Sequence, residues 1–514
     1  MSTKEFNAVR ARSALPVTLA VAAAIWSSGA FAQSSSEMDD MKRQIQDMQR
    51  KLDAMSAAQA KAQAAPAAKP AAPSNKYEGI QAGPLNIKLG GFIEFAGIYR
   101  SRNETSDVGS NFNGVPYPSS SNYYLNEFRE TARQSRISIL VAGPNDGHQH
   151  AEAYYEMDFL GGAQTANSKE SNSYNLRQRN IYGSYFNDDS GFSMHFGQSW
   201  SLATQYRVGL NPRSELVPST IDAQYVPGFT WTRNPQLRFI EKFNSAVSVG
   251  LSLESPQALF GGRAPTGVIA TNTGGGQYNN TNAYSFDSAP DVILKLALDP
   301  GWGHYEIFGI ERRFKDRSVG SATVAGANHS ASGATVGGSV LLPLVPKVLE
   351  FQASIMSGKG AGRYGSVQLP DATYDTNGDV LTMKMTSILT GLTWHATPAL
   401  DLYAYYGQEK VDDEYRAVFS PAGAITGYTG YGIPTLEFSG CSFEGGTCAP
   451  NTHKVQQATA GAWWKAYRGP LGYVQLGLQW SNTKQQAFAG LNGVTPDTRL
   501  NIGMLSIRYY PYQN

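Results

Sequence analysis

The chain has 514 residues, of which 16% are charged and 53 are glycine, and its mean hydropathy is -0.33. These values fit neither a helical membrane protein nor a disordered chain, and 28 tyrosines and 22 phenylalanines favour a fold rich in β-strands. The net charge is +1. A chain so close to neutrality predicts no nucleic-acid partner.

The first 32 residues have the pattern of a secretory signal peptide. Three cations among residues 1–12 precede an apolar run from Ala14 to Trp26, and Ala30-Phe31-Ala32 supplies small residues at a cleavage site. The alternative is an uncleaved anchor helix, but the apolar run is too short to span a membrane. We therefore predict a signal peptide at residues 1–32 and an exported mature protein.

Two cysteines, Cys441 and Cys448, lie far beyond this signal, with six residues between them. Disulfides persist in exported proteins, and neither a second cysteine pair nor a nearby histidine cluster accompanies these two residues. We predict that they form a disulfide across a loop and belong to no metal site. No cofactor is expected.

Residues 33–56 carry an apolar residue at every third or fourth position, which is the spacing of a heptad seam. We predict a periplasmic coiled-coil helix here, and because three heptads are marginal alone, it would depend on subunits held together elsewhere. A solitary amphipathic helix is the alternative. Residues 57–76 are rich in Ala and Pro and predict an extended linker. The seam residues are Met38, Met41, Ile45, Met48, Leu52 and Met55.

From residue 77 onward, polarity alternates along segments of about ten residues, as expected of half-buried strands. In residues 151–159, for example, apolar side chains alternate with Glu152, Glu156 and Asp158. Sixteen segments show this pattern, near residues 87–100, 132–142, 149–160, 175–186, 191–198, 230–243, 245–255, 290–299, 303–315, 332–342, 347–358, 381–395, 399–411, 454–466, 472–483 and 499–511.

The connections between these segments alternate strictly between short and long. Short ones carry turn residues, as in Gly143-Pro144-Asn145-Asp146-Gly147, whereas long ones include residues 101–131, 256–289 and 412–453. An even number of strands, with short turns at one end and long loops at the other, is the signature of a bacterial outer-membrane barrel. We predict an all-β membrane protein in which residues 77–514 form a 16-stranded antiparallel transmembrane β-barrel.

Several segments resemble the general trimeric porins, and the heptad helix with its linker resembles the DcaP-like branch of that family. The resemblance covers roughly residues 33 to 514. It implies a homotrimeric channel, and the branch is associated with uptake of dicarboxylates and aromatic acids. The chain departs from the family in ending on Gln513-Asn514 and in carrying Gln198 where Arg is common. The similar segments are residues 88–95, 133–139, 155–159, 175–183 and 196–198.

Residues 199–231 lie where the third outer loop of porins folds into the lumen. We predict that they form a constriction loop, and its balanced charges, Arg207 and Arg213 against Glu215 and Asp222, make a purely acidic constriction unexpected. The aromatic residues of this stretch either line the pore or serve in packing and membrane anchoring. They are Trp200, Tyr206, Tyr225 and Trp231.

The strands themselves offer inward cations, because placing the apolar face outward directs one set of arginines toward the lumen. Rows of Arg and Lys select anions in pores, and a guanidinium offers a carboxylate a planar fork of donors. The alternative is that these arginines pair with Glu152, Glu156 and Asp158 and only satisfy the wall. The predicted cationic row consists of Arg136, Arg177, Arg179, Arg238 and Lys242.

Signs of catalysis are weak. His148 and His150 lie beside a turn without a third ligand at suitable spacing. Residues 375–379 read Asp-Thr-Asn-Gly-Asp but lack the spaced Glu of a calcium loop. The chain is therefore predicted not to be an enzyme.

The sequence thus favours a passive porin in the outer membrane of a Gram-negative bacterium, biased toward small anionic solutes such as carboxylates. Its expected partners are two further copies of the chain, outer-membrane lipid and lipopolysaccharide. The alternative is a structural anchor whose coiled coil contacts the periplasm or peptidoglycan.

Overall fold

The computed structural model describes residues 43, 46–51, 53, 54, 79–162, 172–273 and 282–512. The chain divides into two units, Met1–Pro73 and Ser74–Asn514. In the first unit every described residue is helical, and Met48 of the predicted seam is 59% exposed. The signal peptide, the other seam residues and the linker lie outside the described residues. None of the described helices is long and apolar enough to cross a membrane.

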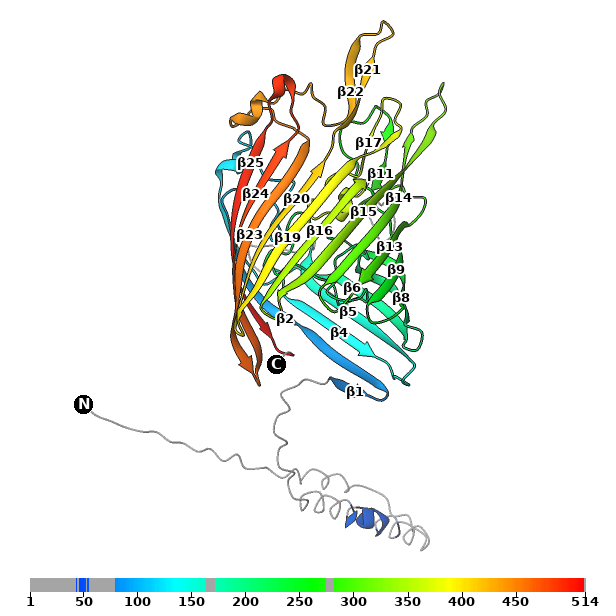
Figure 1. The fold of residues 1–514 in the computed structure, drawn as a ribbon, viewed down its shortest axis with the longest axis vertical. Helices are drawn as coiled ribbons and strands as arrows, with labels where there is room; N and C mark the ends of the chain where they lie inside the picture. The colour runs from blue at the N-terminus through cyan, green and yellow to red at the C-terminus, as the bar shows by residue number, and fades with distance from the viewer. Residues whose placement is uncertain are drawn as a thin grey trace, which may run out of the picture. The chain divides into compact units, whose positions relative to one another are not determined.

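The second unit is a closed antiparallel β-barrel (Figure 1). Of nineteen strands in its sheet, β1 (Ile80–Ala82) and β10 (Val268–Ile269) are short additions, and β3 (Glu127–Thr131) is followed by β4 (Arg136–Ala142) along the same path, so sixteen strands form the wall. The others are β2 (Leu85–Arg100), β5 (Gln149–Gly161), β6 (Asn175–Asn187), β7 (Phe192–Trp200), β8 (Arg233–Lys242), β9 (Val247–Glu254), β13 (Asp291–Leu298), β14 (His304–Ser318), β15 (Ala327–Val345), β16 (Leu349–Lys359), β19 (Lys384–Thr397), β20 (Leu400–Val411), β23 (Thr452–Gly469), β24 (Gly472–Ala487) and β25 (Asp497–Tyr510).

The barrel closes where its first wall strand meets its last. β2 pairs with β25 from Ile93 opposite Tyr509 to Arg100 opposite Ile502. Closure leaves no open edge, so every strand finds a hydrogen-bonding neighbour on both sides, as a lipid environment requires. The predicted 16-stranded barrel is confirmed.

The connections sort by end, with short turns at one end and long loops at the other, as the sequence predicted (Figure 1). At the turn between β6 and β7, Gly191 has a φ of 82°, and a Cβ there would lie 2.2 Å from the carbonyl oxygen of Lys242. Only glycine fits this close approach. The long loops add three small hairpins that the sequence did not predict: β11 (Thr271–Thr273) with β12 (Ala283–Ser285), β17 (Ala372–Tyr374) with β18 (Val380–Thr382), and β21 (Glu414–Phe419) with β22 (Ile425–Tyr431).

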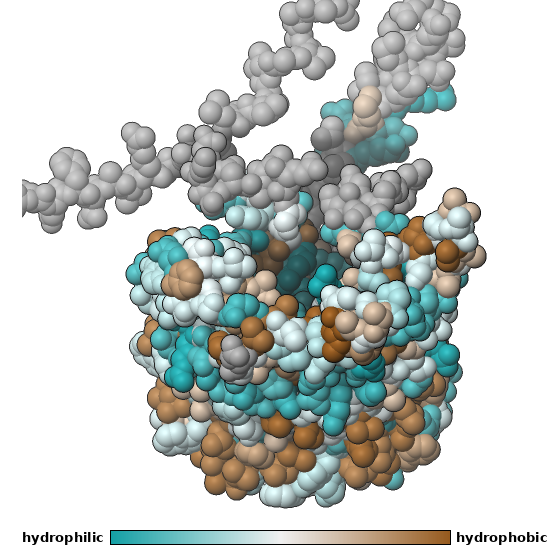
Figure 2. Space-filling model, turned by 90° about the horizontal axis from the view of Figure 1, so that it is seen from above, coloured by the Kyte–Doolittle hydropathy of each residue, from teal (hydrophilic) through white to brown (hydrophobic). Residues whose placement is uncertain are grey.

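The wall presents apolar side chains to the outside and polar ones to the interior. On β24, Leu478 and Trp480 are 66% and 52% exposed, whereas their neighbours Gln479 and Ser481 are buried. Figure 2 shows hydrophobic residues on the outer wall and a hydrophilic hollow within the loop-bearing end. This inversion of a soluble protein's pattern is that of a barrel surrounded by lipid.

One predicted strand is broken. A continuous strand over residues 132–142 was expected, but residues 132–135 form a turn in which Ser135 N donates to Ala132 O at 3.0 Å. The ladder bond lost there is replaced by Glu94 N, which donates to Ser135 Oγ at 2.9 Å. The prediction was wrong at these four residues because a side-chain acceptor on one strand substitutes for the backbone acceptor on its neighbour.

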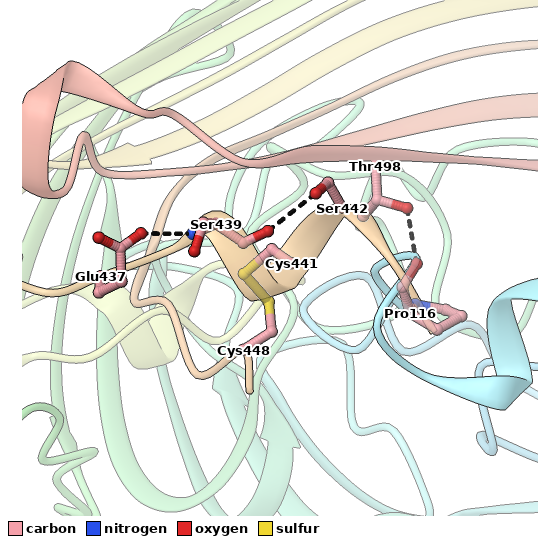
Figure 3. Close-up of a disulfide and its surroundings, with 7 residues drawn as sticks. All are labelled: Pro116, Glu437, Ser439, Cys441, Ser442, Cys448 and Thr498. Atoms are coloured by element: carbon pink, nitrogen blue, oxygen red, sulfur yellow. Dashed lines mark hydrogen bonds between the residues drawn. A yellow bond between two sulfur atoms is a disulfide. The ribbon is translucent and has the colours of Figure 1, made fainter. Parts of the chain in front are cut away.

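A disulfide joins Cys441 to Cys448 in the loop between β22 and β23 (Figure 3). Cys441 lies in the short 3-10 turn η3 (Ser439–Ser442), where Ser442 Oγ donates to Ser439 O at 2.8 Å. Beside this turn, Gly445 N donates to Ser119 O, in the loop after β2, at 2.9 Å. The bridge therefore holds one outer loop in the shape that contacts another.

Replacing both cysteines, in C441S/C448S, should loosen this loop and leave the barrel folded, because the bridge spans a separation of only seven residues and joins no wall strand. A disulfide that closes so short a loop stabilises the folded state by about 2 kcal/mol. We expect limited proteolysis to cut residues 432–451 faster in this variant, while its heat-resistant migration in gels stays that of the parent. S420A, in the neighbouring turn between β21 and β22, is the control. Equal cutting of all three proteins would contradict the expectation.

Candidate pore constriction

Residues 201–232 leave the wall after β7, enter the barrel interior and return at β8. Their apolar side chains are buried against inward-facing residues of the wall. The first part packs against Ile240, Phe308 and Met356, and the last part against Leu389 and Tyr405. The buried apolar residues of the loop include Leu202, Tyr206, Leu210, Ile221, Tyr225, Val226 and Phe229.

Carboxylates on the barrel accept hydrogen bonds from the backbone N–H groups of this loop. A buried N–H without a partner costs free energy comparable to a lost hydrogen bond, so each carboxylate fixes one point of the loop's path. The four pairs are Glu254 with Leu202 (2.8 Å), Glu306 with Tyr206 (3.0 Å), Asp299 with Gly209 (3.0 Å) and Glu409 with Gly228 (2.8 Å).

Cations on the wall satisfy the loop's carbonyl groups. Arg238 donates to Trp200 O at 2.5 Å and to the Tyr206 hydroxyl at 2.6 Å, and Lys295 donates to Thr204 O at 2.7 Å. Both side chains have no exposed surface. Arg238 was predicted to belong to a cationic row lining the pore, and in the structure its donors instead hold the loop. Lys242, from the same predicted row, lies exposed at the short-turn end of β8.

Residues 219–221, in the middle of the loop, are held by uncharged wall groups. Ile221 N donates to Gln479 Oε1 at 2.6 Å, Ser219 N donates to the Tyr405 hydroxyl at 3.1 Å, and Trp463 Nε1 donates to Ser219 O at 2.8 Å. These contacts lie on β24, β20 and β23, far along the chain from β7. The loop thus reaches across the lumen to strands that sequence proximity does not connect with it.

A cavity of about 490 Å³ remains between residues 217–225 of the loop and the facing wall. Its lining draws on the first, second and last strands of the barrel and includes side chains of both charge signs. The charged residues are Glu94, Arg136, Glu156, Asp158, Arg179, Arg207, Asp222, Asp401 and Arg508.

Three of the predicted pore arginines meet two carboxylates of β5. Asp158 accepts from Arg177 Nη2 at 2.6 Å and from Arg179 Nη1 at 2.9 Å, and Glu156 accepts from Arg179 Nε at 2.6 Å. For Arg177 and Arg179 this is the wall pairing considered as the alternative. Arg136 differs, because its Nη1 lies 3.6 Å from Glu156 and its side chain is 28% exposed at the cavity.

A fourth arginine, which the sequence analysis did not place in the pore, joins this group. Arg233 lies with its guanidinium 4.8 Å from the Trp200 ring and 4.7 Å from the Trp231 ring. Within the described part of the chain, no ion pair joins it to a carboxylate, and its Nη1 has no hydrogen-bond partner. Four guanidinium groups therefore share two carboxylates, which leaves a local excess of positive charge.

Tyr225 is the loop residue that lies among these arginines. Its φ of 65° is unusual for a residue other than glycine. Burial acts to raise the pKa of its hydroxyl, but the charges of Arg179, Arg136 and Arg233 outweigh burial and hold the pKa below its ordinary value. The hydroxyl thus lies in a strongly positive field.

The loop carries two arginines and two acidic residues, but its positive and negative charges do not cancel as this count suggests. Arg207 pairs with Glu350 at 3.1 Å, and Arg213 pairs with Glu152. Burial raises the pKa of Glu215 to about 7, against opposing backbone hydrogen bonds, and burial also raises the pKa of Asp222, which accepts from Ser110. Glu215 therefore carries less negative charge at neutral pH than the sequence count suggested.

Arg508 is a further lumen cation that sequence reasoning missed. Its Nε lies 3.1 Å from Glu94 Oε1, and its guanidinium lies 4.8 Å from the ring of Phe92 and 4.6 Å from that of Trp463. The alternation along β25 could have marked it as inward-facing. The pairing of the first strand with the last, which places it beside Glu94, has no signal in the local sequence.

Most of the remaining candidate residues take part in packing, ion pairs or turns. Trp200 and Tyr206 are 5% and 0% exposed, which agrees with packing, whereas Tyr225, 8% exposed, is one of the residues that line the cavity. His148 and His150 pair across the turn with Asp189 and Asp188. In residues 375–379, Asp375 Oδ1 accepts from Asn377 N and Asp379 N within a turn. Among the described residues, no group of three His, Cys, Asp or Glu side chains is placed to hold a metal ion.

Comparison with solved structures finds proteins of similar fold. DcaP, an outer-membrane channel of Acinetobacter baumannii, matches with 18% identity over 84% of this chain and 99% of its own, at a TM-score of 0.59. The anion-selective porin of Comamonas acidovorans (11% identity, 83% and 99% covered, TM-score 0.43) and Salmonella typhi OmpF with daunomycin (10%, 84% and 99%, 0.43) are more distant. No protein-family model matches the chain, and no curated protein sequence matches it. The likeness to DcaP shows a shared barrel fold.

The anchoring of the loop can be tested at Glu409, which accepts from Gly228 N at 2.8 Å and from Val367 N at 3.2 Å. E409A would leave two buried N–H groups unpaired, at about 1–3 kcal/mol each, whereas E409Q keeps one acceptor oxygen. We expect E409A to lower the melting temperature and E409Q to lower it less. Single-channel current through E409A should also be larger and noisier. E311A, on the outer face of β14, is the control, and identical behaviour of E409A and E311A would contradict the anchoring.

Proposed function

We propose that this protein is an outer-membrane porin for passive diffusion of small hydrophilic solutes, with a bias toward anions such as dicarboxylates or aromatic acids. The observation that carries the proposal is the cavity of about 490 Å³ inside a closed barrel, bounded on one side by an inward-folded loop. A narrowed polar passage through an apolar-coated barrel suits diffusion of water-soluble molecules. Charged side chains of both signs at the narrowing favour solutes that can exchange hydration for hydrogen bonds.

The anion bias rests on which charges remain after pairing. Arg136 is 28% exposed and has no hydrogen-bonded carboxylate, while Arg233 has no ion pair among the described residues. Because the neighbouring carboxylates Glu156 and Asp158 are engaged by Arg177 and Arg179, the local balance is positive. Guanidinium groups that carboxylates only partly neutralise can attract anions along a pore and bind carboxylates.

The proposal includes a homotrimer in the outer membrane of a Gram-negative bacterium, with the N-terminal helix in the periplasm. Support comes from the heptad spacing of residues 33–56, together with the helical state of the described residues there. A helix of three heptads gains stability when a barrel trimer already holds its copies together.

Selectivity can be measured as the reversal potential in a salt gradient across a planar bilayer. We expect anion preference in the parent and about a tenfold lower anion-to-cation permeability ratio in R136Q, since a unit positive charge about 6 Å from a solute favours an anion and disfavours a cation by about 0.7 kcal/mol each in water. R136K, which retains the charge, should stay close to the parent. R508Q should change the ratio in the same direction.

R313Q serves as the control, because Arg313 is exposed on the outer face of β14. An unchanged ratio in both R136Q and R508Q would show that paired arginines only satisfy the wall. A folded trimer without conductance would instead favour the structural anchor.

A further inference from the structure

One buried histidine lies between two of the carboxylates that hold the interior loop. His304, the first residue of β14, has only 1% of its surface exposed. Its Nδ1 lies 2.8 Å from Asp299 Oδ1, and its Nε2 lies 3.1 Å from Glu306 Oε1. We call these three residues the histidine clamp. The clamp lies where β13 turns into β14, at the short-turn end of the barrel.

The geometry of the clamp indicates which form of the imidazole it holds. A neutral imidazole has one N–H donor and one acceptor nitrogen, whereas an ionised carboxylate offers acceptors only. Both ring nitrogens of His304 face carboxylate oxygens. With ionised carboxylates, both hydrogen bonds can therefore form together only when the ring is the imidazolium cation. Two carboxylates beside a histidine favour that charged form.

Other elements packed around the clamp bring both charged and uncharged groups. On β15, Leu341 is opposite His304, and Ser339 donates to Glu306. Glu306 also binds Lys295 Nζ at 2.9 Å through its second oxygen, so the oxygen that faces His304 has no cation but the imidazolium. The further titratable or charged groups of this region are Lys295 on β13, Arg238 on β8, and Tyr206, Arg207 and Glu215 of the interior loop.

Both carboxylates of the clamp also accept hydrogen bonds from the interior loop. The Glu306 oxygen that faces His304 accepts from Tyr206 N at 3.0 Å. The other oxygen of Asp299 accepts from Gly209 N, also at 3.0 Å. A single imidazole therefore links the two carboxylates that fix the loop backbone at two points three residues apart.

Arg207 lies between these two fixed points. Its side chain is 48% exposed, contributes to the lining of the cavity, and lies 3.1 Å from Glu350. An ion pair with this exposure contributes little to holding a long side chain in place. The backbone on either side of Arg207 therefore decides where its charge lies, and the clamp holds that backbone.

We propose that protonated His304 is a positioning residue that holds Arg207 at the constriction, and that loss of its proton loosens residues 204–210. A neutral ring can keep only one of its two donated bonds, which leaves one buried carboxylate without its cationic partner. The clamp is thus complete on the acid side of the ordinary range of histidine, about pH 6.5, and is lost as the pH rises. Its effect on solutes rests on the pore function proposed above, but its effect on the loop does not.

Hydrogen–deuterium exchange of the peptide that covers residues 202–212 measures the loop directly in the detergent-solubilised protein. The parent, H304Q and the control H150Q are compared at about pH 6 and about pH 9, each corrected for intrinsic exchange. Protection of this peptide in the parent should fall by about tenfold between these conditions, since a charged hydrogen bond is lost. H304Q should be weakly protected at both. H150Q should follow the parent, because His150 lies beside a distant turn and pairs with Asp188. Equal protection of the parent at both pH values would overturn the proposal.

D299N distinguishes a titrating clamp from a histidine that only fills space. The asparagine can still accept from Gly209 N, but it removes one of the charges that favour the imidazolium, and its amide can donate to a neutral ring. The pH at which protection falls should therefore move down by about one unit. An unchanged midpoint would show that the proton on His304 does not hold the loop.

The reversal potential, measured over the same pH range, links the clamp to the pore. The anion preference of the parent should weaken as the pH rises, whereas that of H304Q should start lower and change less. A pH-dependent loop in a protein without conductance would refute the pore and leave the clamp standing. A conducting channel with a pH-independent loop would refute the clamp alone.

Discussion

The interior loop depends on one constraint: each backbone group that it carries into the barrel must find a partner there. Some partners lie within the loop, as where Leu216 N donates to Gln205 O. Wall strands have already used their own backbone groups in the ladder, so wall side chains supply further partners. Glu254, Glu306 and Glu409 accept from the loop, and Arg238 and Lys295 donate to it. The path of the loop is therefore fixed by inward-facing side chains on strands that lie far apart in sequence.

This constraint also decides which charges are left for solutes. A wall charge that binds the loop cannot also meet a passing ion, which is why Arg238 contributes no exposed surface. Arg177 and Arg179 are similarly occupied by Asp158 and Glu156. In the proposed pore, selectivity would therefore depend on the groups left over, Arg136 above all, and a count of inward charges overstates the charge available to a solute.

The sequence predicted the wall well because alternation is a local property, visible strand by strand, and because turn residues mark where strands end. It could not predict the break at residues 132–135, which depends on Ser135 meeting Glu94 on another strand. Arg508 was missed for the same reason: its surroundings come from the pairing of the first and last strands. Burial of Tyr206 likewise follows from a loop path set by distant acceptors.

Successive side chains of a strand point to opposite faces, so neighbouring residues can serve different roles inside and outside the barrel. On β20, Glu409 points inward and holds Gly228 of the interior loop, while the next residue, Lys410, points outward and pairs with Asp412 at 2.9 Å. A carboxylate that holds the interior loop can therefore occupy an inward position without changing the side chain that the same strand presents outward. The inner and outer faces of one strand end thus meet different requirements, because successive side chains point in opposite directions.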